Sequence, residues 1–261
     1  MSHQNYTIQT QALSIGYKTK SETKIIAKDI NLALSKGKLI ALVGENGIGK
    51  STLLKTLTGI IPPIQGEIAL LNKPLQSYKP LALAKELSIV LTEKLPPSNL
   101  TVYEIIALGR QPYTNWLGNL TSEDHDKIEE AIALTDIAHL TAKKHDEISD
   151  GQLQIVLITR CLSQNTSIIA LDEPTTHLDL VHKADLLKLL QKLAHETGKT
   201  IVYSTHDIDL AIQMADEMIV ITSQQIIQDQ PCNLIQSGIF NTLFDSKHLS
   251  FDATIGKFKI K

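Results

Sequence analysis

A glycine-rich segment that begins at Gly44 has the composition and spacing of a phosphate-binding loop. It follows an apolar run at 39–43 and precedes a leucine pattern with helical spacing, which is the strand–loop–helix context that G-x-x-x-x-G-K-[ST] requires. Glycines let backbone N–H groups surround phosphate oxygens without Cβ clashes, and the helix directs its positive dipole end at them. The predicted nucleotide-binding residues are Gly44, Glu45, Asn46, Gly47, Ile48, Gly49, Lys50, Ser51 and Thr52.

Two carboxylates that follow a second apolar run complement this loop. The run at 167–171 ends at Asp172 and Glu173. A carboxylate at a strand edge that faces a phosphate loop can hold Mg²⁺ through water, and this role falls to Asp172. Ser51 would give its hydroxyl to the same metal, and Lys50 would reach the β- and γ-phosphates. Glu173 is then placed to orient or deprotonate the attacking water. An acidic pair after a strand also occurs as a solvated loop start, and the phosphate loop favours the catalytic interpretation.

These residues need a sheet whose strands alternate with helices. Residues 6–11 and 25–34 alternate in polarity and predict two N-terminal strands, whereas 95–147 is mostly helical. Beyond this stretch the patterns predict helices at 151–163, 180–196, 207–214 and 231–244, and strands at 167–171, 200–204, 217–229 and 251–260. Such alternation is typical of an α/β fold with a mostly parallel sheet covered on both faces.

The composition excludes several classes of protein. The 261 residues are 43% hydrophobic and 20% charged with a net charge of −3, which describes an ordinary globular chain without a general nucleic-acid-binding surface. No apolar run approaches the ~18 residues that span a bilayer. Residues 1–5 lack the basic and apolar regions of an export signal, so we do not expect export. Two distant cysteines, Cys161 and Cys232, fit a reducing cytoplasm better than a disulfide framework.

The segment Ile148-Ser149-Asp150-Gly151-Gln152 decides between families. By itself, Ser149 with Gln152 three residues later is a capping box that opens the helix predicted at 151–163. Because Gln152 lies twenty residues before Asp172, however, the segment resembles the signature motif, usually LSGGQ, of ATP-binding-cassette (ABC) ATPases.

Further positions match the same family. Tyr17 resembles the aromatic residue that stacks on adenine, Thr176-His177-Leu178-Asp179 resembles the D-loop, and His206 resembles the switch histidine. The helical insertion lies where this family places its α-subdomain, so the resemblance covers essentially the whole chain. Two positions keep an alternative, since Tyr17 could pack at a strand end and His206 could be an ordinary polar residue in a turn.

The resemblance implies the fold in more detail. It implies a P-loop NTPase (RecA-like) core with a mostly parallel sheet, an N-terminal antiparallel β-subdomain and an inserted α-helical subdomain. The single ABC ATPase domain would cover 1–261, in which 1–94 and 148–261 form the core with its β-subdomain and 95–147 form the helical subdomain.

The resemblance also implies a mechanism in which two copies of the chain sandwich two ATP molecules with Mg²⁺. One copy supplies the phosphate loop and the strand-end carboxylates, and the other supplies the signature. His206 is implied to hold the γ-phosphate and to help position water beside Glu173, and Asp179 to couple the two sites across the interface. The signature residues implied to bind the partner's nucleotide are Ser149, Gly151 and Gln152.

Two positions depart from the family pattern. The third signature residue is Asp150 instead of glycine, which adds a carboxylate near a phosphate site. After the strand expected at 87–91, Thr92 stands where the family has a glutamine that touches Mg²⁺ and communicates with the membrane partner, and Glu93 follows it. A hydroxyl and a carboxylate can each ligate Mg²⁺, so both residues remain open for this role.

The segment 100–113 points to the system that the chain serves. It resembles the T-V-x-E-x-x-x-x-G-R-x-P-[YH] segment of ATPases of bacterial importers of iron–siderophore complexes, haem or vitamin B12, in which it receives a coupling helix of the permease. The implied partners are a second copy of the chain, membrane permease subunits and, indirectly, a solute-binding protein, but no nucleic acid. The implied location is the cytoplasmic face of the membrane, where the chain is peripheral.

Three alternatives stay open beside this interpretation. The segment 100–113 could be only an amphipathic helix that closes the helical subdomain. The chain could be a soluble ABC ATPase of DNA repair or translation, although it lacks the long coiled-coil insertion or second cassette usual there. The altered residue at Thr92 would also fit an ATP-gated module with little turnover.

Overall fold

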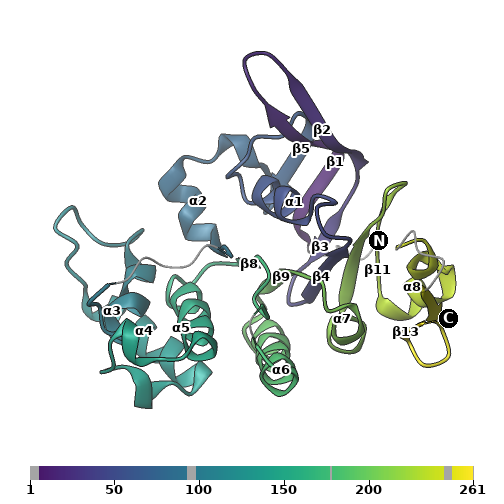
Figure 1. The fold of residues 1–261 in the computed structure, drawn as a ribbon. Coiled ribbons are helices and arrows are strands. Elements are labelled where there is room, and N and C mark those ends of the chain that lie inside the picture. Colours follow the sequence, from purple (N-terminus) through teal and green to yellow (C-terminus); the bar gives the residue numbers. More distant parts are fainter. Residues whose placement is uncertain (1–5, 93–97, 177, 244–248, 261) are drawn as a thin grey trace.

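The computed structural model describes residues 6–92, 98–176, 178–243 and 249–260. In these residues a mostly parallel central sheet carries an antiparallel sheet at one end, a helical part at one side and a small C-terminal unit at the opposite side (Figure 1). The predicted fold class, a P-loop NTPase core with an N-terminal antiparallel sheet and a helical subdomain, is therefore confirmed.

The central sheet holds the strand ends that carry the polar site residues. Its neighbouring strands are parallel except for the β10–β11 pair. Because side chains alternate along a strand, Leu39, Ala41 and Val43 join the core on one face and Ile40 and Leu42 the core on the other. In spatial order the strands are β11 (Ile226–Asp229), β10 (Glu217–Ile221), β4 (Leu39–Gly44), β9 (Thr200–Thr205), β8 (Ile168–Leu171) and β7 (Leu87–Val90).

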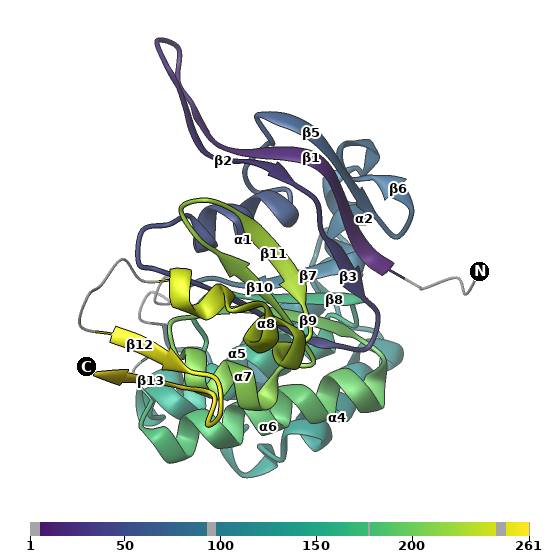
Figure 2. The same ribbon diagram turned by 90° about the vertical axis from the view of Figure 1, so that its right-hand side faces the viewer.

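The antiparallel sheet differs from the prediction in one respect. The run at 25–34, predicted as one strand, forms two strands that pair with different parts of β1. The chain leaves β2 after Ile30 and enters β3 at Ala33, and Asp29, with a left-handed φ of 57°, lies where the register of the β1–β2 pair shifts. The strands predicted within 217–229 are β10 and β11, which form a hairpin. The antiparallel sheet consists of β1 (Tyr6–Lys18), β2 (Thr23–Ile30), β3 (Ala33–Ser35), β5 (Gln65–Leu70) and β6 (Lys73–Pro74), and the β1–β2 hairpin projects from it (Figure 2).

Three helices form the helical part beside the core. They are α3 (Val102–Ala107), α4 (Ser122–Thr135) and α5 (Asp150–Ser163). Helix α5 packs against α3 and α4 and also against strand β7, so it connects the helical part to the central sheet (Figure 1). The domain boundaries at 94/95 and 147/148 remain a prediction. Short 3₁₀ turns complete this region at Leu108–Arg110, Ala138–Leu140 and His145–Glu147.

The remaining helices cover the central sheet and end the chain. Helix α1 (Lys50–Leu57) follows the phosphate loop, α2 (Pro80–Glu86) precedes β7, and α6 (Leu180–Thr197) and α7 (Ile208–Met214) follow β8 and β9. The C-terminal unit contains α8 (Pro231–Ser237), a 3₁₀ turn at Ile239–Thr242 and the β12–β13 hairpin (Leu249–Asp252 and Lys257–Ile260), as predicted for these segments. None of the described helices combines the length and the apolar character that crossing a bilayer would demand.

Candidate functional site

The phosphate loop adopts a backbone that only glycine supports at three points. Gly47 and Gly49 have φ values of 79° and 116°, in the region that L side chains avoid. A Cβ on Gly49 would lie 2.6 Å from Ile26 Cγ2, and one on Gly44 would lie 2.8 Å from the carbonyl oxygen of Ile221. The loop is therefore a close-fitting cradle with an open face at Gly47, where an added Cβ would meet no atom within 4 Å.

Lys50 lies at the floor of this cradle. Its side chain is 6% exposed, and Nζ donates hydrogen bonds to the carbonyl oxygens of Gly44 (2.9 Å) and Glu45 (3.2 Å). Burial lowers the pKa of the amine below its ordinary value, and the negative charges of Glu173 and Asp172 oppose this change. Such an ammonium group, held by carbonyls and close to two carboxylates, can exchange these contacts for phosphate oxygens.

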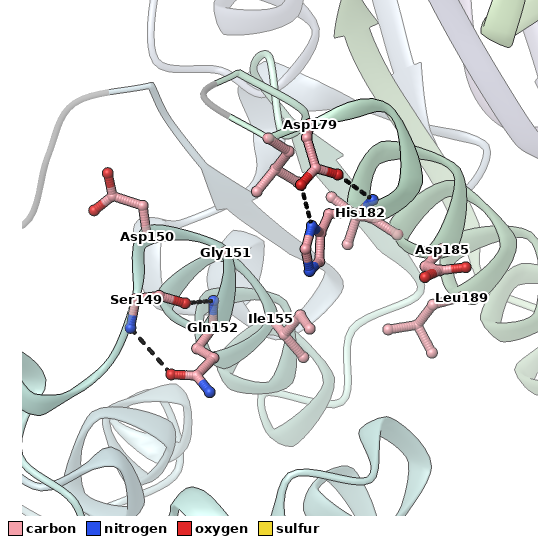
Figure 3. A pocket seen from close by; sticks show the side chains of 11 residues that line it. Ser149, Asp150, Gly151, Gln152, Ile155, Asp179, His182, Asp185 and Leu189 are labelled. Atoms are coloured by element: carbon pink, nitrogen blue, oxygen red, sulfur yellow. Dashed lines mark hydrogen bonds and ion pairs between the residues drawn. The ribbon is translucent and has the colours of Figure 1, made fainter.

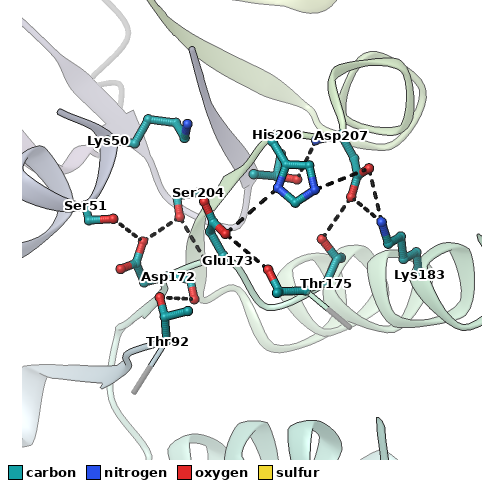
Figure 4. A network of polar contacts seen from close by, with 12 residues as sticks. Lys50, Ser51, Thr92, Asp172, Glu173, Thr175, Lys183, Ser204, His206 and Asp207 are labelled. Carbon is teal, nitrogen blue, oxygen red and sulfur yellow. Dashed lines mark hydrogen bonds and ion pairs between the residues drawn. The ribbon is translucent and has the colours of Figure 1, made fainter. Parts of the chain in front are cut away.

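Asp172 joins the phosphate loop to the neighbouring strands, as Figure 4 shows. Its Oδ1 accepts hydrogen bonds from Ser51 Oγ (3.0 Å) and from Ser204 Oγ (2.6 Å), and the side chain is buried. A hydroxyl and a carboxylate beside a phosphate cradle are the hard oxygen donors that Mg²⁺ prefers. In the described part of the chain, no three histidine, cysteine or acidic side chains are arranged so that they could hold a metal ion, so a metal here would also need oxygens of the nucleotide and of water.

Ser204 is a site residue that the sequence interpretation missed. Its Oγ donates to Asp172 and accepts from the backbone N–H of Glu173 (2.8 Å), so it fixes both acidic residues. The available signal was its position. It lies near the carboxyl end of a predicted strand, two residues before His206, and carboxyl ends of parallel strands meet at one edge of the sheet.

Glu173 has an unusual backbone conformation that directs its side chain toward His206. Its φ is 50°, which is uncommon for a residue other than glycine, and the Ser204 hydrogen bond holds it there. Glu173 Oε2 accepts from Thr176 Oγ1 (3.1 Å) and lies 3.9 Å from His206 Nδ1 (Figure 4). A carboxylate and an imidazole at this separation can share one water molecule or one phosphate oxygen between them.

Tyr17 contacts the end of the phosphate loop, and Thr92 contacts the acidic strand end. Tyr17 is 48% exposed, and its hydroxyl lies 3.0 Å from Thr52 Oγ1, so the ring stands beside the start of α1 with a free surface. Thr92 Oγ1 donates to the carbonyl oxygen of Asp172 at 3.3 Å, so the residue adjoins the acidic strand end. The alternative candidate, Glu93, lies outside the described residues.

The signature residues form a second site, away from the loop. Ser149 caps helix α5: its Oγ accepts from Gln152 N (3.2 Å), and Gln152 Oε1 accepts from Ser149 N (3.0 Å), as the capping box predicts. A cavity of about 550 Å³ opens here between the starts of α5 and α6 (Figure 3). Its lining includes Asp179, whose carboxylate caps α6 and contacts His182 Nδ1 at 2.8 Å.

The two sites share no lining residue. The signature cavity is lined by residues of 149–155 and 178–189, and none of the loop residues 44–52, Asp172, Glu173 or His206 takes part. Gly151 lets Leu178 pack closely at the cavity wall, because a Cβ there would lie 3.1 Å from Leu178 Cδ2. One copy of the chain therefore presents two separate polar surfaces, one suited to a triphosphate and one a helix N-terminus with free space before it.

The segment 100–113 has a structural explanation for most of its motif. Thr101 and Glu104 form a capping box at the start of α3. Gly109 is required because a Cβ would lie 2.3 Å from the carbonyl oxygen of Arg160 in α5. The ring of Tyr113 lies between two cations, with Arg110 Cζ at 3.9 Å and Lys85 Nζ at 4.8 Å from its centroid.

Arg110 forms a buried ion pair that the sequence interpretation did not detect. Arg110 Nε lies 2.8 Å from Asp124 Oδ1, both side chains are 3% exposed, and Arg110 also donates to the carbonyl oxygen of Ser163 (2.8 Å). Burial raises the pKa of Asp124, but hydrogen bonds from Thr121 and Arg110 outweigh it and leave the pKa below its ordinary value. Arg110 thus connects the start of α4 to the end of α5.

Comparisons with known proteins agree with this geometry. The model of the ABC transporter family matches residues 27–176. An uncharacterized ABC transporter ATP-binding protein of Methanocaldococcus jannaschii is 39% identical over 255 residues, 97% of this chain and 87% of the relative. The achromobactin transport ATP-binding protein of Dickeya dadantii is 34% identical over an alignment that covers 91% of this chain and 87% of that protein. A solved structure of a metal-chelate type ABC transporter in an inward-facing conformation has a TM-score of 0.80 at 28% identity, over 98% of this chain and 96% of that chain.

These similarities and the two polar sites define the class of protein. The chain belongs to the ABC transporter family of ATP-binding proteins. It is an ABC-type ATPase subunit, and the fold and the family predicted from the signature segment are confirmed.

Proposed function

We propose that this chain binds and hydrolyses ATP in an importer of iron chelates of the siderophore type, as a nucleotide-sandwich dimer at the cytoplasmic face of the membrane. The observation that carries the dimer is the separation of the loop site from the signature site within one chain. In this proposal, the loop site and the signature site each supply only part of the contacts to one ATP molecule. A head-to-tail pair of copies completes both.

The loop site does the chemistry in this proposal. The glycine cradle of 44–52 binds the triphosphate through its N–H groups, and Lys50 exchanges its carbonyl contacts for the β- and γ-phosphates. Glu173 accepts a proton from the attacking water, and His206, 3.9 Å away, holds the γ-phosphate and orients that water. Tyr17 offers its free ring surface to adenine.

Three residues would hold Mg²⁺ in this site, namely Ser51, Asp172 and Thr92, of which Thr92 contacts the backbone of Asp172. When bound, the ion would supply positive charge that offsets the negative charge developing on the phosphate. Ser204 donates a hydrogen bond to the Asp172 carboxylate and so fixes the orientation in which this carboxylate would face the metal ion.

The second copy would complete the site with its signature. Ser149, Gly151, Gln152 and the first N–H groups of α5 form an anion site at a helix N-terminus, where the macrodipole favours a γ-phosphate. Asp179, at the start of α6 and in the same cavity, couples the two sites. Hydrolysis removes the γ-phosphate and with it the bridge between the copies.

The proposed cargo and permease contact come from relatives and from the helical part. The Dickeya dadantii relative is named for achromobactin transport, and the structural neighbour for metal chelates. The rigid segment 100–113, anchored by the Arg110–Asp124 pair, presents exposed Leu108 to a permease helix. A solute-binding protein would act on the permease and only indirectly on this chain.

The Glu173→Gln variant tests the dimer and the chemistry together. With ATP and Mg²⁺ we expect a stable dimer in light scattering, with hydrolysis reduced roughly 10²- to 10⁴-fold because the proton acceptor is lost. ADP in place of ATP should leave the variant monomeric. A variant that stays monomeric with ATP, or that hydrolyses ATP at the wild-type rate, would contradict the proposal.

Reconstitution with the permease encoded beside this chain tests the transport role. ATP hydrolysis in vesicles should rise when a solute-binding protein loaded with an iron chelate is added, and labelled chelate should accumulate. If haem or cobalamin stimulated hydrolysis instead, the cargo would be that compound, and the chain would still serve an importer of the same group.

A further inference from the structure

An ion pair joins helix α6 to the loop that carries His206. Lys183 Nζ lies 2.9 Å from Asp207 Oδ2 and 3.2 Å from Asp207 Oδ1, and the two side chains are 17% and 23% exposed (Figure 4). Lys183 is the fourth residue of α6, at the end of its first turn, whereas Asp207 directly follows His206. Because both charges are largely shielded from water, this pair is stronger than an exposed pair on the helix surface.

The Asp207 carboxylate has a further partner in the loop after β8. Thr175 Oγ1 donates to Asp207 Oδ2 at 3.3 Å, and Thr175 is two residues beyond Glu173. The same carboxylate therefore meets three segments, namely α6, the Glu173 loop and the His206 loop. None of these contacts was expected from the sequence.

The position of Asp207 matters because its carboxylate is also close to the imidazole. His206 lies between two acids, with Nδ1 at 3.9 Å from Glu173 Oε2 and Nε2 at 4.0 Å from Asp207 Oδ1. An Asp207 carboxylate released from Lys183 would be free to pair with His206 and to place an unbalanced negative charge beside the γ-phosphate. Lys183 prevents both by holding and neutralising it.

Helix α6 also reaches the surface proposed to meet the second copy. Asp179 caps α6, and the backbone N–H of Lys183 donates to the carbonyl oxygen of Asp179 at 2.9 Å. A shift of this first turn against the partner therefore moves Lys183, and the ion pair passes the shift to Asp207 and His206.

We infer that Lys183 is a positioning residue, which acts through Asp207 to hold His206 facing Glu173 and to connect the dimer surface with the hydrolysis site. This inference rests on the proposed function, because it assigns a role within the same ATPase cycle. It adds Lys183 and Asp207 to the machinery, beyond the residues proposed to bind the nucleotide.

The test compares single substitutions in the full chain. For Lys183→Met, kcat should fall roughly tenfold, since the histidine is no longer held, while KM and the Kd for ATP change less than about twofold. Lys183→Arg keeps the charge and the donors and should recover kcat to within about threefold of the wild type. The matched control is Lys192→Met, on the same helix, where the lysine is 61% exposed and lies 4.0 Å from Glu196; this variant should match the wild type.

A double substitution separates positioning from simple stabilisation of the fold. If the harm in Lys183→Met comes from the released carboxylate, adding Asp207→Asn removes that carboxylate, and the double variant should hydrolyse ATP faster than Lys183→Met alone. A purely structural ion pair predicts no such recovery. The inference is overturned if kcat of Lys183→Met equals that of Lys192→Met, if ATP affinity falls as much as kcat, or if the double variant is no faster. A wild-type chain without ATPase activity would instead refute the proposed function.

Discussion

The loop site and the signature site differ in how far one chain completes them. Around the loop, polar groups are buried and bonded to each other, as in the Ser51–Asp172–Ser204 chain of hydrogen bonds at 3.0 and 2.6 Å. Around the signature, the side chains of Ser149 and Gln152 each bond the other residue's backbone N–H, within a capping box that borders an open cavity. The polar groups of the loop site are therefore held in place by one another without a ligand. Those of the signature site are also held, but the space in front of them is empty.

A nucleotide bound between two copies of the chain requires this difference between the loop site and the signature site. A catalytic group must be held in place before the reaction, since preorganised dipoles lose no free energy to rearrangement at the transition state. A surface that binds and releases a partner in each cycle has to remain exposed and still keep its own polar groups satisfied. The capping box meets both requirements, because it satisfies polar groups at the N-terminus of α5 and leaves the space in front of that helix free for a phosphate.

The largest expected effect concerns the preorganised site. Lys50→Met removes the buried cation of the cradle, and we expect hydrolysis to fall by roughly 10³-fold, because phosphate charge loses its principal partner. Single-turnover kinetics with radiolabelled ATP measure this loss. Lys55→Met, at the other end of the same helix, should retain activity. If the two variants behaved alike, the loop site would not be the hydrolysis site.

The two sites also differ in how much of them the sequence predicts. The loop and the acidic strand end at 167–173 are predictable because a local motif and a strand–helix pattern fix them. The capping box at Ser149 is predictable for the same reason, as its two residues are three positions apart. The role of Ser204 depends on which strands are neighbours, since β9 lies beside β8 only in the folded sheet.

Contacts between distant segments are harder to predict. The Arg110–Asp124 and Lys183–Asp207 pairs join residues that are 14 and 24 positions apart in different segments of the fold, and each sequence segment is consistent with an ordinary solvated charge. The interruption between Ile30 and Ala33 was likewise missed, because the alternating polarity continues through it and through Asp29, whose φ is positive. The periodicity of hydrophobic residues shows which face of a helix or strand is buried. Which charged residues then meet depends on how the helices and strands pack together in the folded chain.

The next prediction disturbs the support of the signature site and leaves the loop site intact. Arg110→Met removes one partner of a buried ion pair that connects α4 with α5, and we expect a loss of about 3 kcal/mol in the free energy of unfolding. Urea titration measures this value. Because Arg110 lies in the helical part, the ATP affinity of the folded monomer should stay at the wild-type value.

The double variant Arg110→Met with Asp124→Leu serves as its control. Removing the stranded carboxylate should restore part of the lost stability, because an unpaired buried charge costs more than an apolar pair. A single variant that loses less than about 1 kcal/mol would show that the pair does not hold the helical part together.

A smaller effect distinguishes the cap from the ligand site at Ser149. Ser149→Ala should lower the free energy of unfolding by about 1 kcal/mol through the lost cap. Thr121→Ala removes the equivalent cap of α4 and should have a similar cost. Only Ser149→Ala should weaken ATP-driven dimerisation of the Glu173→Gln chain, measured by analytical ultracentrifugation. Equal dimerisation in both variants would remove Ser149 from the shared nucleotide site.

The smallest effect concerns the carboxylate that replaces glycine in the signature. Asp150 lies in the first turn of α5, where its charge favours the helix dipole but opposes an incoming phosphate. Asp150→Asn removes the charge and keeps a side chain of similar size, so ATP-driven dimerisation should strengthen roughly threefold at low salt. The gain should shrink as salt is raised to about 0.5 M, because ions screen exposed charges. A gain that is absent at low salt, or that persists at high salt, would mean that this carboxylate does not face the partner's phosphate and that the signature site opens elsewhere.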